Sequence, residues 1–580
     1  MQTPTSLDLK KQLLALLSDT VAKTFPDATA TTIELDRPKQ ASHGDYACNF
    51  AMQAAKAMRA NPRAIAEKLL AAIPASPIIE KAEIAGAGFI NFFLSAAAKQ
   101  QVVKTIFAAK EQYGFVHLGE GKKILLEFVS SNPTGPLHVA HGRAAAYGAS
   151  LANLLEAAGY KVGREYYVND AGRQMDILTL STWLRYLELF NIGFSYPANC
   201  YQGDYVITMA EEIKALMGDR LVVANGPVVD GISFEQDAEA YLDALIAKSK
   251  ELLAANYAYV HKHALTKQVN DMRNDLEEFG VHYDCWFSEQ SLYDDGLLNH
   301  ALEELEKRNY SYRKDGALWF RSSQFGDEKD RVLQRENGLY TYFAPDIAYH
   351  LNKFERGSDY VIDIWGPDHH GYIPRVRASV EALGQDPNRF IVIISQLVKL
   401  YRDGELVKLS TRAGNYVTLR DLRTEVGNDA ARFFYVLRKS DQHLDFDLDL
   451  AKSKSNDNPV FYIQYAHARI CSVLEEWAGD ITQLENVDLS SLTGAHELAL
   501  MQTLIDYPQA ISNGAKEYAP HAIAYYLKDL ASALHSYYNA EKFLVADEKV
   551  RLARLSLIAA TKQVIVNGLK LLGVSSPQKM

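Results

Sequence analysis

A repeating pattern of strand, loop and helix begins at about Lys122 and limits the folds that this chain can adopt. An apolar stretch at 124–129 leads into a loop rich in proline and glycine, and a helical pattern follows at about 142–158. The later stretches that fit buried strands are 166–168, 360–365 and 390–395. This alternation predicts a parallel, doubly wound α/β sheet, interrupted by a helical insertion near 185–255.

Different patterns flank this part of the chain, which at 580 residues is too long for a single hydrophobic core. The amino-terminal patterns predict helices at 6–24 and 47–72 and strands at 32–35 and 88–94. After about residue 450 strand patterns disappear, and helices are predicted at 458–478, 493–516, 520–543 and 547–572. We therefore expect an α+β domain at 1–117, the α/β domain at 118–448 and an all-α bundle at 449–580.

Composition excludes several classes of protein. A net charge of -11 gives no whole-molecule attraction for nucleic acid, so RNA binding would need local basic patches and base stacking. No apolar run predicts a membrane span, and the amino terminus lacks the features of an export signal, so we expect a cytoplasmic protein. The four cysteines are far apart and form no metal-binding pattern, so neither a disulfide framework nor a structural metal is expected.

Two histidines, His138 and His141, stand where the loop after the 124–129 strand meets the next helix. Free N–H groups and the helix dipole at such a position attract anions, and imidazoles can donate hydrogen bonds to phosphate oxygens. The pattern therefore favours a nucleotide triphosphate as ligand. The alternative is that the two side chains only cap the helix or bind a metal.

Several longer segments resemble the class I aminoacyl-tRNA synthetases. His138-Val-Ala-His141 resembles the HIGH motif, and 131–138 and 166–174 resemble the arginyl branch of that family. The segment 365–372 is similar to the family's second nucleotide-binding stretch, and 407–415 is similar to its KMSKS loop. The resemblance covers essentially the whole chain, and it implies a Rossmann-like, doubly wound parallel sheet as the catalytic domain.

This resemblance implies an ATP site that takes the nucleotide as its Mg²⁺ complex. The implied ATP-binding residues are His138, His141, Gly142, Gly366, Asp368, His369, Lys408 and Ser410, with His370 as an alternative to His369. His138, His141, Lys408 and Arg412 are the expected catalytic residues, because they would stabilise charge that develops on the phosphates. Two positions depart from the family pattern: Ala140 stands where it has glycine, and Thr411 replaces the second lysine of the loop.

A pocket for arginine needs carboxylates, because a guanidinium is planar, permanently charged and rich in donors. The resemblance assigns Glu127, Tyr342 and Asp346 to the arginine side chain, and Asn132 to its α-amino or carboxylate end. Asp346 would lie in the first turn of a helix, with Tyr342 just before it. The alternative for Glu127 is an ordinary ion pair at the end of a strand.

The two flanking domains resemble the tRNA-binding domains of arginyl enzymes. In the first domain, which would bind the tRNA elbow, Phe89 and Asn91 offer an aromatic face and an amide to an unpaired base. The last domain resembles the DALR anticodon-binding domain, where Tyr462, Tyr465 and Arg469 share one helix face. Tyr538 and Met580 are expected to complete that anticodon site. Burial in the core is the alternative for Phe89, Tyr462 and Tyr538.

The implied activity is that of an arginine–tRNA ligase. It activates L-arginine with ATP to arginyl-adenylate and pyrophosphate, then transfers the arginyl group to the terminal adenosine of arginine tRNA. The resemblance also implies that activation depends on tRNA and that the protein is a monomer. Two alternatives remain: a class I synthetase for another amino acid, and a catalytically silent tRNA-binding protein, which Ala140 and Thr411 suggest.

Overall fold

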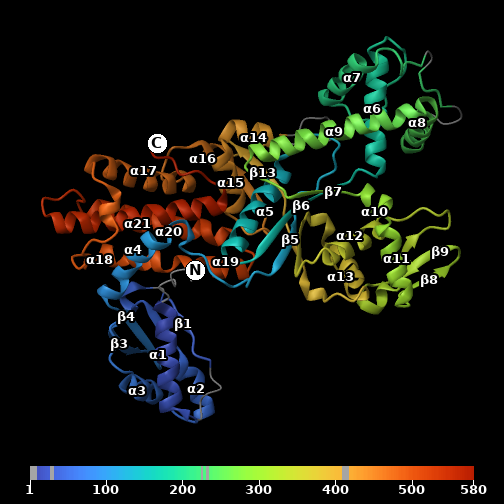
Figure 1. Ribbon diagram of the computed structural model, residues 1–580. Helices are drawn as coiled ribbons and strands as arrows, with labels where there is room; N and C mark the ends of the chain where they lie inside the picture. Colours follow the sequence, from blue (N-terminus) through green and yellow to red (C-terminus); the bar gives the residue numbers. More distant parts are fainter. Residues whose placement is uncertain (1–8, 27–31, 39, 224–225, 230–233, 408–416) are drawn as a thin grey trace. The chain divides into compact units, whose positions relative to one another are not determined.

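The computed structural model describes residues 9–26, 32–38, 40–223, 226–229, 234–407 and 417–580. It divides into two compact units. One is formed by His117–Ser453, and the other combines Met1–Val116 with Lys454–Met580 (Figure 1).

A parallel five-stranded sheet forms the centre of the His117–Ser453 unit. Its strands are β5 (Lys123–Glu127), β6 (Lys161–Val168), β7 (Cys285–Ser288), β11 (Tyr360–Trp365) and β12 (Phe390–Ile394). Their spatial order is β12-β11-β5-β6-β7, and every neighbouring pair is parallel. The chain moves outward from β5 through β6 to β7 and then returns to the other side of β5 at β11. The carboxyl ends of β5 and β11 therefore lie at the switch point where such sheets bind ligands.

Helices cover both faces of this sheet. Figure 1 shows α5 (Val139–Ala157) on one side and α12 (Phe343–Glu355) and α13 (Ile373–Ala382) on the other. Gly148 lets α5 lie close to the sheet, because a Cβ atom there would be 2.3 Å from Cγ of Phe128. The fully buried runs in β11, such as Val361 and Ile362, are typical of a strand covered on both faces.

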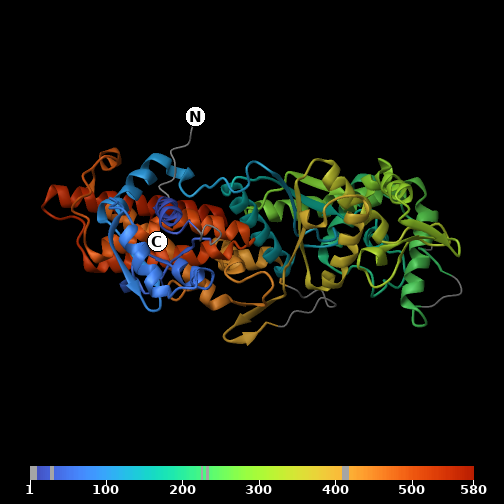
Figure 2. The same ribbon diagram turned by 90° about the horizontal axis from the view of Figure 1, so that it is seen from below.

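A helical insertion and small sheets complete this unit. The insertion between β6 and β7 consists of α6 (Arg173–Glu188), α7 (Asp204–Met217), α8 (Ala238–Leu253) and α9 (Ala255–Glu278). These helices gather beside the sheet around a separate apolar core that contains Trp183 (Figure 1). The three-stranded sheet beyond α11 (Leu297–Lys307) contains β8 (Ser311–Lys314), β9 (Ala317–Phe320) and β10 (Arg331–Gln334). In Figure 2 the yellow-orange β13–β14 hairpin (Val398–Arg402, Glu405–Leu406) projects from the unit.

Further helices and one strand complete this unit. Helix α10 (Gln290–Asp294) follows β7, and the hairpin is followed by α14 (Leu419–Val426), α15 (Asn428–Val436), β15 (Leu444–Asp447) and α16 (Leu448–Lys452). β15 pairs in parallel with β13.

The other unit begins with a four-stranded antiparallel sheet in the order β1-β2-β4-β3. Its elements are α1 (Leu9–Thr24), β1 (Leu35–Asp36), β2 (Tyr46–Cys48), α2 (Phe50–Met58), α3 (Pro62–Ala72), β3 (Ile79–Ala85), β4 (Phe89–Leu94) and α4 (Ala96–Ala109). Helix α4 packs on the carboxy-terminal helices, where Gln100 Nε2 donates to the carbonyl of Leu492 at 3.1 Å. This packing explains why the two ends of the chain form one compact unit.

A helical bundle forms the rest of that unit. It contains α17 (Pro459–Trp477), α18 (Ala495–Ile505), α19 (Tyr507–Lys516), α20 (His521–Ala540) and α21 (Glu548–Leu572). Helix α21 is long and apolar enough to cross a membrane, which the sequence analysis did not anticipate. Its most apolar window is 78% buried inside the protein, as expected for the central helix of a bundle.

The expected fold class is confirmed, but several expected elements are shorter or divided. The expected helix at 47–72 is two helices, because Arg59 has a left-handed φ of 50° and Asn61 caps a new helix that starts at Pro62. The expected helix at 493–516 likewise divides at Asp506. The expected strand at 32–35 is only Leu35–Asp36. The division into three domains at 117 and 448 stays a prediction.

Candidate functional site

The loop after β5 delivers the two motif histidines to the start of α5. His138 is the residue before the helix, and its backbone N–H donates to Nδ1 of His141 at 3.3 Å. The two rings stack with centroids 3.6 Å apart. Because Nδ1 of His141 accepts this bond, its Nε2 carries the hydrogen and can donate to a ligand.

Burial keeps both histidines uncharged in the ligand-free protein. Burial lowers the pKa of His138, and burial together with the neighbouring His138 lowers the pKa of His141 to about 3. They would therefore contact a phosphate as neutral hydrogen-bonding groups rather than as cations.

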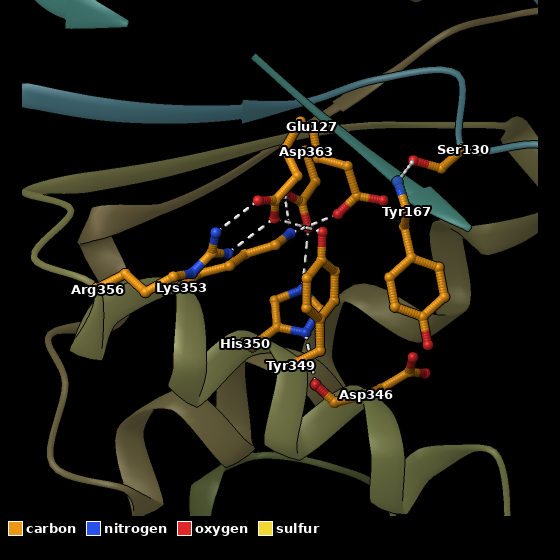
Figure 3. Close-up of polar contacts among 10 residues, drawn as sticks. Glu127, Ser130, Tyr167, Asp346, Tyr349, His350, Lys353, Arg356 and Asp363 are labelled. Carbon is orange, nitrogen blue, oxygen red and sulfur yellow. Dashed lines mark hydrogen bonds and ion pairs between the residues drawn. The ribbon is translucent and has the colours of Figure 1, made fainter. Parts of the chain in front are cut away.

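Strained backbone precedes the histidine pair. Val129 and Ser130 have φ values of 71° and 42°, a conformation that a β-branched residue such as Val129 rarely adopts. Ser130 Oγ accepts a bond from the backbone N–H of Tyr167 at 3.0 Å, which fixes this loop against β6 (Figure 3). Strain of this kind is typical of functional loops.

A cavity of about 1090 Å³ lies at the carboxyl ends of β5 and β11. The cavity is lined by five of the expected ATP-binding residues: His138, His141, Gly366, Asp368 and His369. Asn132 also lines it, as does Ala140, which departs from the family pattern. The cavity is large enough for a nucleotide. The structure therefore brings most of the expected nucleotide residues to one space.

Two predicted positions, Gly142 and His370, do not line this cavity. Gly142 does not line it, and a Cβ atom there would lie 2.7 Å from Cδ1 of Leu419 and 2.9 Å from the hydroxyl of Tyr435. Packing inside the protein is thus enough to require glycine at that position. His370 is exposed and also stands outside the cavity lining.

The expected loop residues Lys408, Ser410, Thr411 and Arg412 lie outside the described residues. Residues 417–419, the first described residues after this loop, lie beside the histidine loop. Val139 N donates to the carbonyl of Val417 at 3.3 Å, and Leu419 N donates to the carbonyl of Leu137 at 2.8 Å. Thr418 between them lines the cavity, so the segment that follows the loop is fixed at the cavity.

The insertion supplies one wall that the sequence analysis missed. Residues 200–205, which lead into the first turn of α7, line the cavity. The Tyr205 hydroxyl donates to the carbonyl of Thr134 at 2.7 Å, and Asn132 Nδ2 donates to Oε1 of Gln174 at 2.7 Å. No motif marks residues 200–205, because only the fold brings them to the histidine loop.

Two of the candidate arginine residues, Tyr342 and Asp346, lie at the start of α12. Asp346 lies in that turn as expected, and its carboxylate accepts a hydrogen bond from the Tyr372 hydroxyl. Tyr342 directly precedes the helix and is 74% exposed. Burial raises the pKa of Asp346, and Tyr372 and nearby cations only partly offset this effect.

Glu127 belongs to a buried network of charges that attaches α12 to the sheet (Figure 3). Lys353 Nζ contacts Glu127 Oε2 at 2.5 Å and Asp363 Oδ1 at 2.8 Å, and its side chain is fully buried. Burial raises the pKa of Glu127, although Lys353 opposes this shift. The ion pair considered for Glu127 in the sequence analysis is therefore present.

Tyr349 of α12 and Arg356, the residue directly after this helix, extend the network to β6. The Tyr349 hydroxyl donates to Glu165 Oε1 at 2.8 Å, and Arg356 Nη1 lies 2.6 Å from Glu165 Oε2. His350 contacts Asp363 Oδ2 through Nε2 at 2.9 Å and the carbonyl of Asp346 through Nδ1 at 2.7 Å. One face of α12 is thus bonded to β5, β6 and β11, which fixes the helix that carries Asp346 (Figure 3).

The anticodon candidates of the bundle also come together. Arg469 lies with its guanidinium 3.6 Å from the Tyr538 ring centroid and 5.4 Å from that of Tyr465. The ring of Tyr462 stands 4.5 Å from that of His535, a residue that the sequence analysis missed. Arg469 Nη1 donates to His535 Nδ1 at 3.0 Å. Two helices, α17 and α20, therefore share a cluster of rings and one cation.

The remaining candidate tRNA-binding residues differ in how far they are exposed to solvent. Met580, the last residue, is 53% exposed, and the tail before it is held against α17 by His467 Nδ1, which donates to the carbonyl of Pro577 at 2.8 Å. Phe89 at the start of β4 is 36% exposed and accessible to a base. Asn91, two residues later, is buried.

Among the residues that the structure describes, no group of three or more His, Cys, Asp or Glu side chains is arranged to hold a metal ion.

Comparison with known proteins places these features in a family. Three family models match: the arginyl tRNA synthetase N terminal domain at residues 10–94, the class I (R) tRNA synthetase catalytic domain at 102–443 and the DALR anticodon binding domain at 463–580. The arginine–tRNA ligase of Nitrosospira multiformis is 59% identical and that of Nitrosomonas eutropha is 56% identical, each over the full length of both chains.

Solved structures give the same result. A putative arginyl-tRNA synthetase from Campylobacter jejuni is 34% identical with a TM-score of 0.74, covering 84% of this chain and 100% of its own. The arginyl-tRNA synthetase of Thermus thermophilus shares the fold, with a TM-score of 0.75 at 23% identity, covering 98% of this chain and 100% of its own. With its motif histidines at the switch point and family matches along nearly its entire length, this chain belongs to the arginyl-tRNA synthetases of class I.

Proposed function

We propose that this protein is an arginine–tRNA ligase, which activates L-arginine with Mg²⁺-ATP and esterifies it to the terminal adenosine of arginine tRNA. The observation that carries the proposal is the cavity at the switch point, where His138 and His141 face Gly366 and Asp368 across the ends of β5 and β11. A nucleotide placed there has its phosphates at the amino terminus of α5, where free N–H groups attract anions.

In the first step, an oxygen of the arginine carboxylate attacks the α-phosphorus of ATP, and the bond to the bridging oxygen of pyrophosphate breaks. This step needs no nucleophile from the protein. Catalysis comes from holding the two substrates in line and from donors aimed at the phosphates. The Nε2–H of His141 is one such donor, because its Nδ1 is occupied by the backbone of His138.

Cations on the segment 407–415 balance charge on the leaving pyrophosphate. The family resemblance assigns Lys408 and Arg412 to this role and Ser410 to ATP binding. Support comes from the neighbouring Thr418, which lines the cavity, and from the backbone bonds that join 417–419 to 137–139.

The arginine side chain lies toward the first turn of α12, with Asp346 and Tyr342 at its guanidinium and Asn132 at its α-amino or carboxylate end. Glu127 supplies further negative charge from β5, shared with Lys353. The support is that Asn132 lines the same cavity as the motif histidines, so an arginine carboxylate held by Asn132 would share that space with the phosphates of ATP.

In the second step, a hydroxyl of the terminal ribose of the tRNA attacks the carbonyl carbon of the adenylate, and AMP leaves. Phe89 contacts the tRNA elbow, and the buried Asn91 supports the strand that presents it, whereas Tyr462, Tyr465, Arg469, Tyr538 and Met580 contact the anticodon. The corresponding division of the chain is an elbow-binding domain at 1–117, a catalytic domain at 118–448 and an anticodon-binding domain at 449–580. The protein acts as a cytoplasmic monomer without attachment to a membrane.

Charging of tRNA with each of the twenty amino acids tests the proposal directly. Arginine alone should become attached to total tRNA, in a reaction that requires ATP and Mg²⁺. Attachment of another amino acid would show that the amino-acid pocket is misassigned. A protein that binds tRNA but charges it with nothing would be the silent binder.

A further inference from the structure

A buried arginine joins the motif helix to one wall of the nucleotide cavity. Arg143 lies on α5, two residues after His141, and only 1% of it is exposed. Two positions along a helix turn by about 200°, so these two side chains leave the same helical turn in different directions. His141 lines the cavity, whereas Arg143 does not. One turn of α5 therefore supports two separate interactions.

The guanidinium of Arg143 binds backbone carbonyls of two segments. Its Nη1 donates to the carbonyls of Gln396 and Gln442 at 2.8 Å each, and its Nη2 donates to the carbonyl of Lys439 at 2.8 Å. Gln396 follows β12, and the other two carbonyls belong to the turn 439–442 between α15 and β15. A planar guanidinium can hold several acceptors at once, because its donors form a rigid fork.

The segment 395–397 forms one wall of the nucleotide cavity. The backbone N–H of Ser395 donates to the carbonyl of Trp365, the last residue of β11, at 2.8 Å. The backbone N–H of Gln396 donates to the carbonyl of Ser440, in the turn 439–442, at 2.9 Å. The wall is thus bonded to β11 and to this turn, and Arg143 bonds both the wall and the turn to α5.

Arg143 is buried without a carboxylate partner. Within the described residues its hydrogen bonds go to carbonyl oxygens alone, and it forms no ion pair. Burial lowers the pKa of Arg143 to about 10, so the side chain stays charged near pH 7. A buried charge without a countercharge is costly unless its surroundings bond it well. A residue that only filled space here would be apolar, so the charge indicates that its three bonds are needed.

We propose that Arg143 is a positioning residue for the reaction, which fixes the wall 395–397 relative to His141 and so aligns the bound nucleotide. The assignment deepens the proposed function and rests on it, because it takes the cavity to be the ATP site. Because Arg143 does not line the cavity, it acts through the wall rather than on a substrate. Its loss frees the wall from α5, while Asp346 stays attached to the sheet through His350. The effect should therefore concern ATP far more than arginine.

Kinetics of tRNA charging by the full-length protein test this proposal. Arg143→Met removes the donors, and it should raise the KM for ATP by about tenfold and lower kcat, because three carbonyls lose their partner. The KM for arginine should change by less than about twofold. Arg143→Lys should raise the KM for ATP by a smaller factor of about threefold, since an ammonium can still donate to some of these carbonyls.

Arg432 on α15 provides the matched control. It is also 1% exposed, burial also lowers its pKa to about 10, and its Nη1 donates to the carbonyls of Phe279 and Gly280 at 2.9 and 3.0 Å. Neither of these carbonyls belongs to a residue that lines the cavity. Arg432→Met should therefore lower the melting temperature, as Arg143→Met does, but leave the KM for ATP as in wild type. The comparison separates a positioning role from a loss of stability.

An unchanged KM for ATP in Arg143→Met, or in Arg143→Lys if the methionine variant does not fold, would overturn this role and leave the proposed function standing. An equal rise of both KM values, or a rise of the same size in Arg432→Met, would overturn it as well. Calorimetry of Mg²⁺-ATP binding without arginine or tRNA makes the test independent of charging. If wild type binds ATP but charges nothing, the proposed function is wrong, and weaker ATP binding by the Arg143 variants still supports the positioning role. If wild type binds no ATP, both are overturned.

Discussion

His141 combines a fixed hydrogen-bond direction with an uncharged ring. The backbone N–H of His138 occupies its Nδ1, and burial, followed by the proximity of His138, lowers its pKa to about 3. In the ligand-free protein this histidine is therefore a neutral donor at Nε2 across the whole neutral range. Its contribution to catalysis should depend on that one hydrogen rather than on a positive charge.

We predict that His141→Ala lowers kcat/KM for ATP in amino-acid activation by roughly a hundredfold, because one donor to the reacting phosphates is lost. The pH profile of the remaining activity should parallel that of wild type between about pH 6 and 8, since His141 does not titrate there. Steady-state kinetics over this range measure both effects. If wild-type activity changes with pH in this range and the activity of the variant does not, a charged His141 is required.

Asp346→Asn should raise the KM for arginine by at least tenfold and change the KM for ATP little. The reason is that a charge-assisted hydrogen bond to a buried carboxylate contributes about 1.5–3 kcal/mol. The Asp346 carboxylate accepts a hydrogen bond from the Tyr372 hydroxyl, and in the proposed pocket the guanidinium of arginine would be its cation. Kinetics with each substrate varied in turn measure the split, and an equal rise of both KM values would contradict the arginine role.

At the scale of secondary-structure elements, the buried charge network fixes the position of helix α12 on the sheet. Lys353 joins β5 to β11, and Arg356 and Tyr349 join the helix to β6. These strands end in the loops that line the nucleotide cavity. A change in this network should therefore disturb arginine and nucleotide binding together, in contrast to a change at Asp346.

We predict that Lys353→Met lowers the free energy of unfolding by about 3–5 kcal/mol, because it leaves buried carboxylates without their cation. Adding Glu127→Gln to that variant should recover part of the loss, since one unpaired charge is then removed. Urea unfolding followed by tryptophan fluorescence measures these differences. Lys307→Met, which removes an exposed ion pair with Glu304, is the control, and a loss of similar size there would contradict this account.

The cluster on α17 and α20 should act in tRNA binding. Arg469→Ala removes the cation that lies over Tyr538 and bonds to His535, and we predict a KM for tRNA raised by roughly tenfold. Tyr525→Ala, which removes an exposed ring elsewhere on α20, should leave charging unchanged. Charging rates at varied tRNA concentration measure both variants. Unaltered charging by the Arg469 variant, with circular dichroism like that of wild type, would refute the anticodon role.

The sequence predicted elements well where burial produces a simple pattern. The central strands β5, β11 and β12 are short apolar runs, and α17, α20 and α21 have clear helical periods. It failed at β8, β9 and β10, where strands such as Ser-Tyr-Arg-Lys at 311–314 are polar and half-exposed. The division of the helix at 47–72 was in fact readable, because Asn61-Pro62 is a capping and helix-starting pair.

The candidate site was predictable only where local motifs mark it. His138, Gly366 and Asp368 belong to such motifs, and the structure gathers them at one cavity. Residues 200–205 and His535 carry no local pattern, because their surroundings come from segments far away in the sequence. His535, for example, contacts Arg469 only when α17 and α20 pack together.

At the scale of the whole molecule, the proposed functions are distributed between the two compact units. The His117–Ser453 unit contains the nucleotide cavity and α12, whereas the unit of Met1–Val116 and Lys454–Met580 carries the candidate contacts to tRNA. Because α4 packs on α18 and α21, the amino-terminal elements and the helical bundle belong to one compact unit. The family resemblance implies that arginine activation depends on tRNA. This dependence would require communication between the two units.

ATP–pyrophosphate exchange, run with each amino acid in turn and with or without total tRNA, tests the central claim most directly. The account predicts exchange with arginine alone, and only when tRNA is present. Exchange with a different amino acid would place that amino acid, not arginine, in the pocket beside Asp346. The absence of exchange under every condition, with tRNA binding intact, would contradict the claim that the chain is an active ligase.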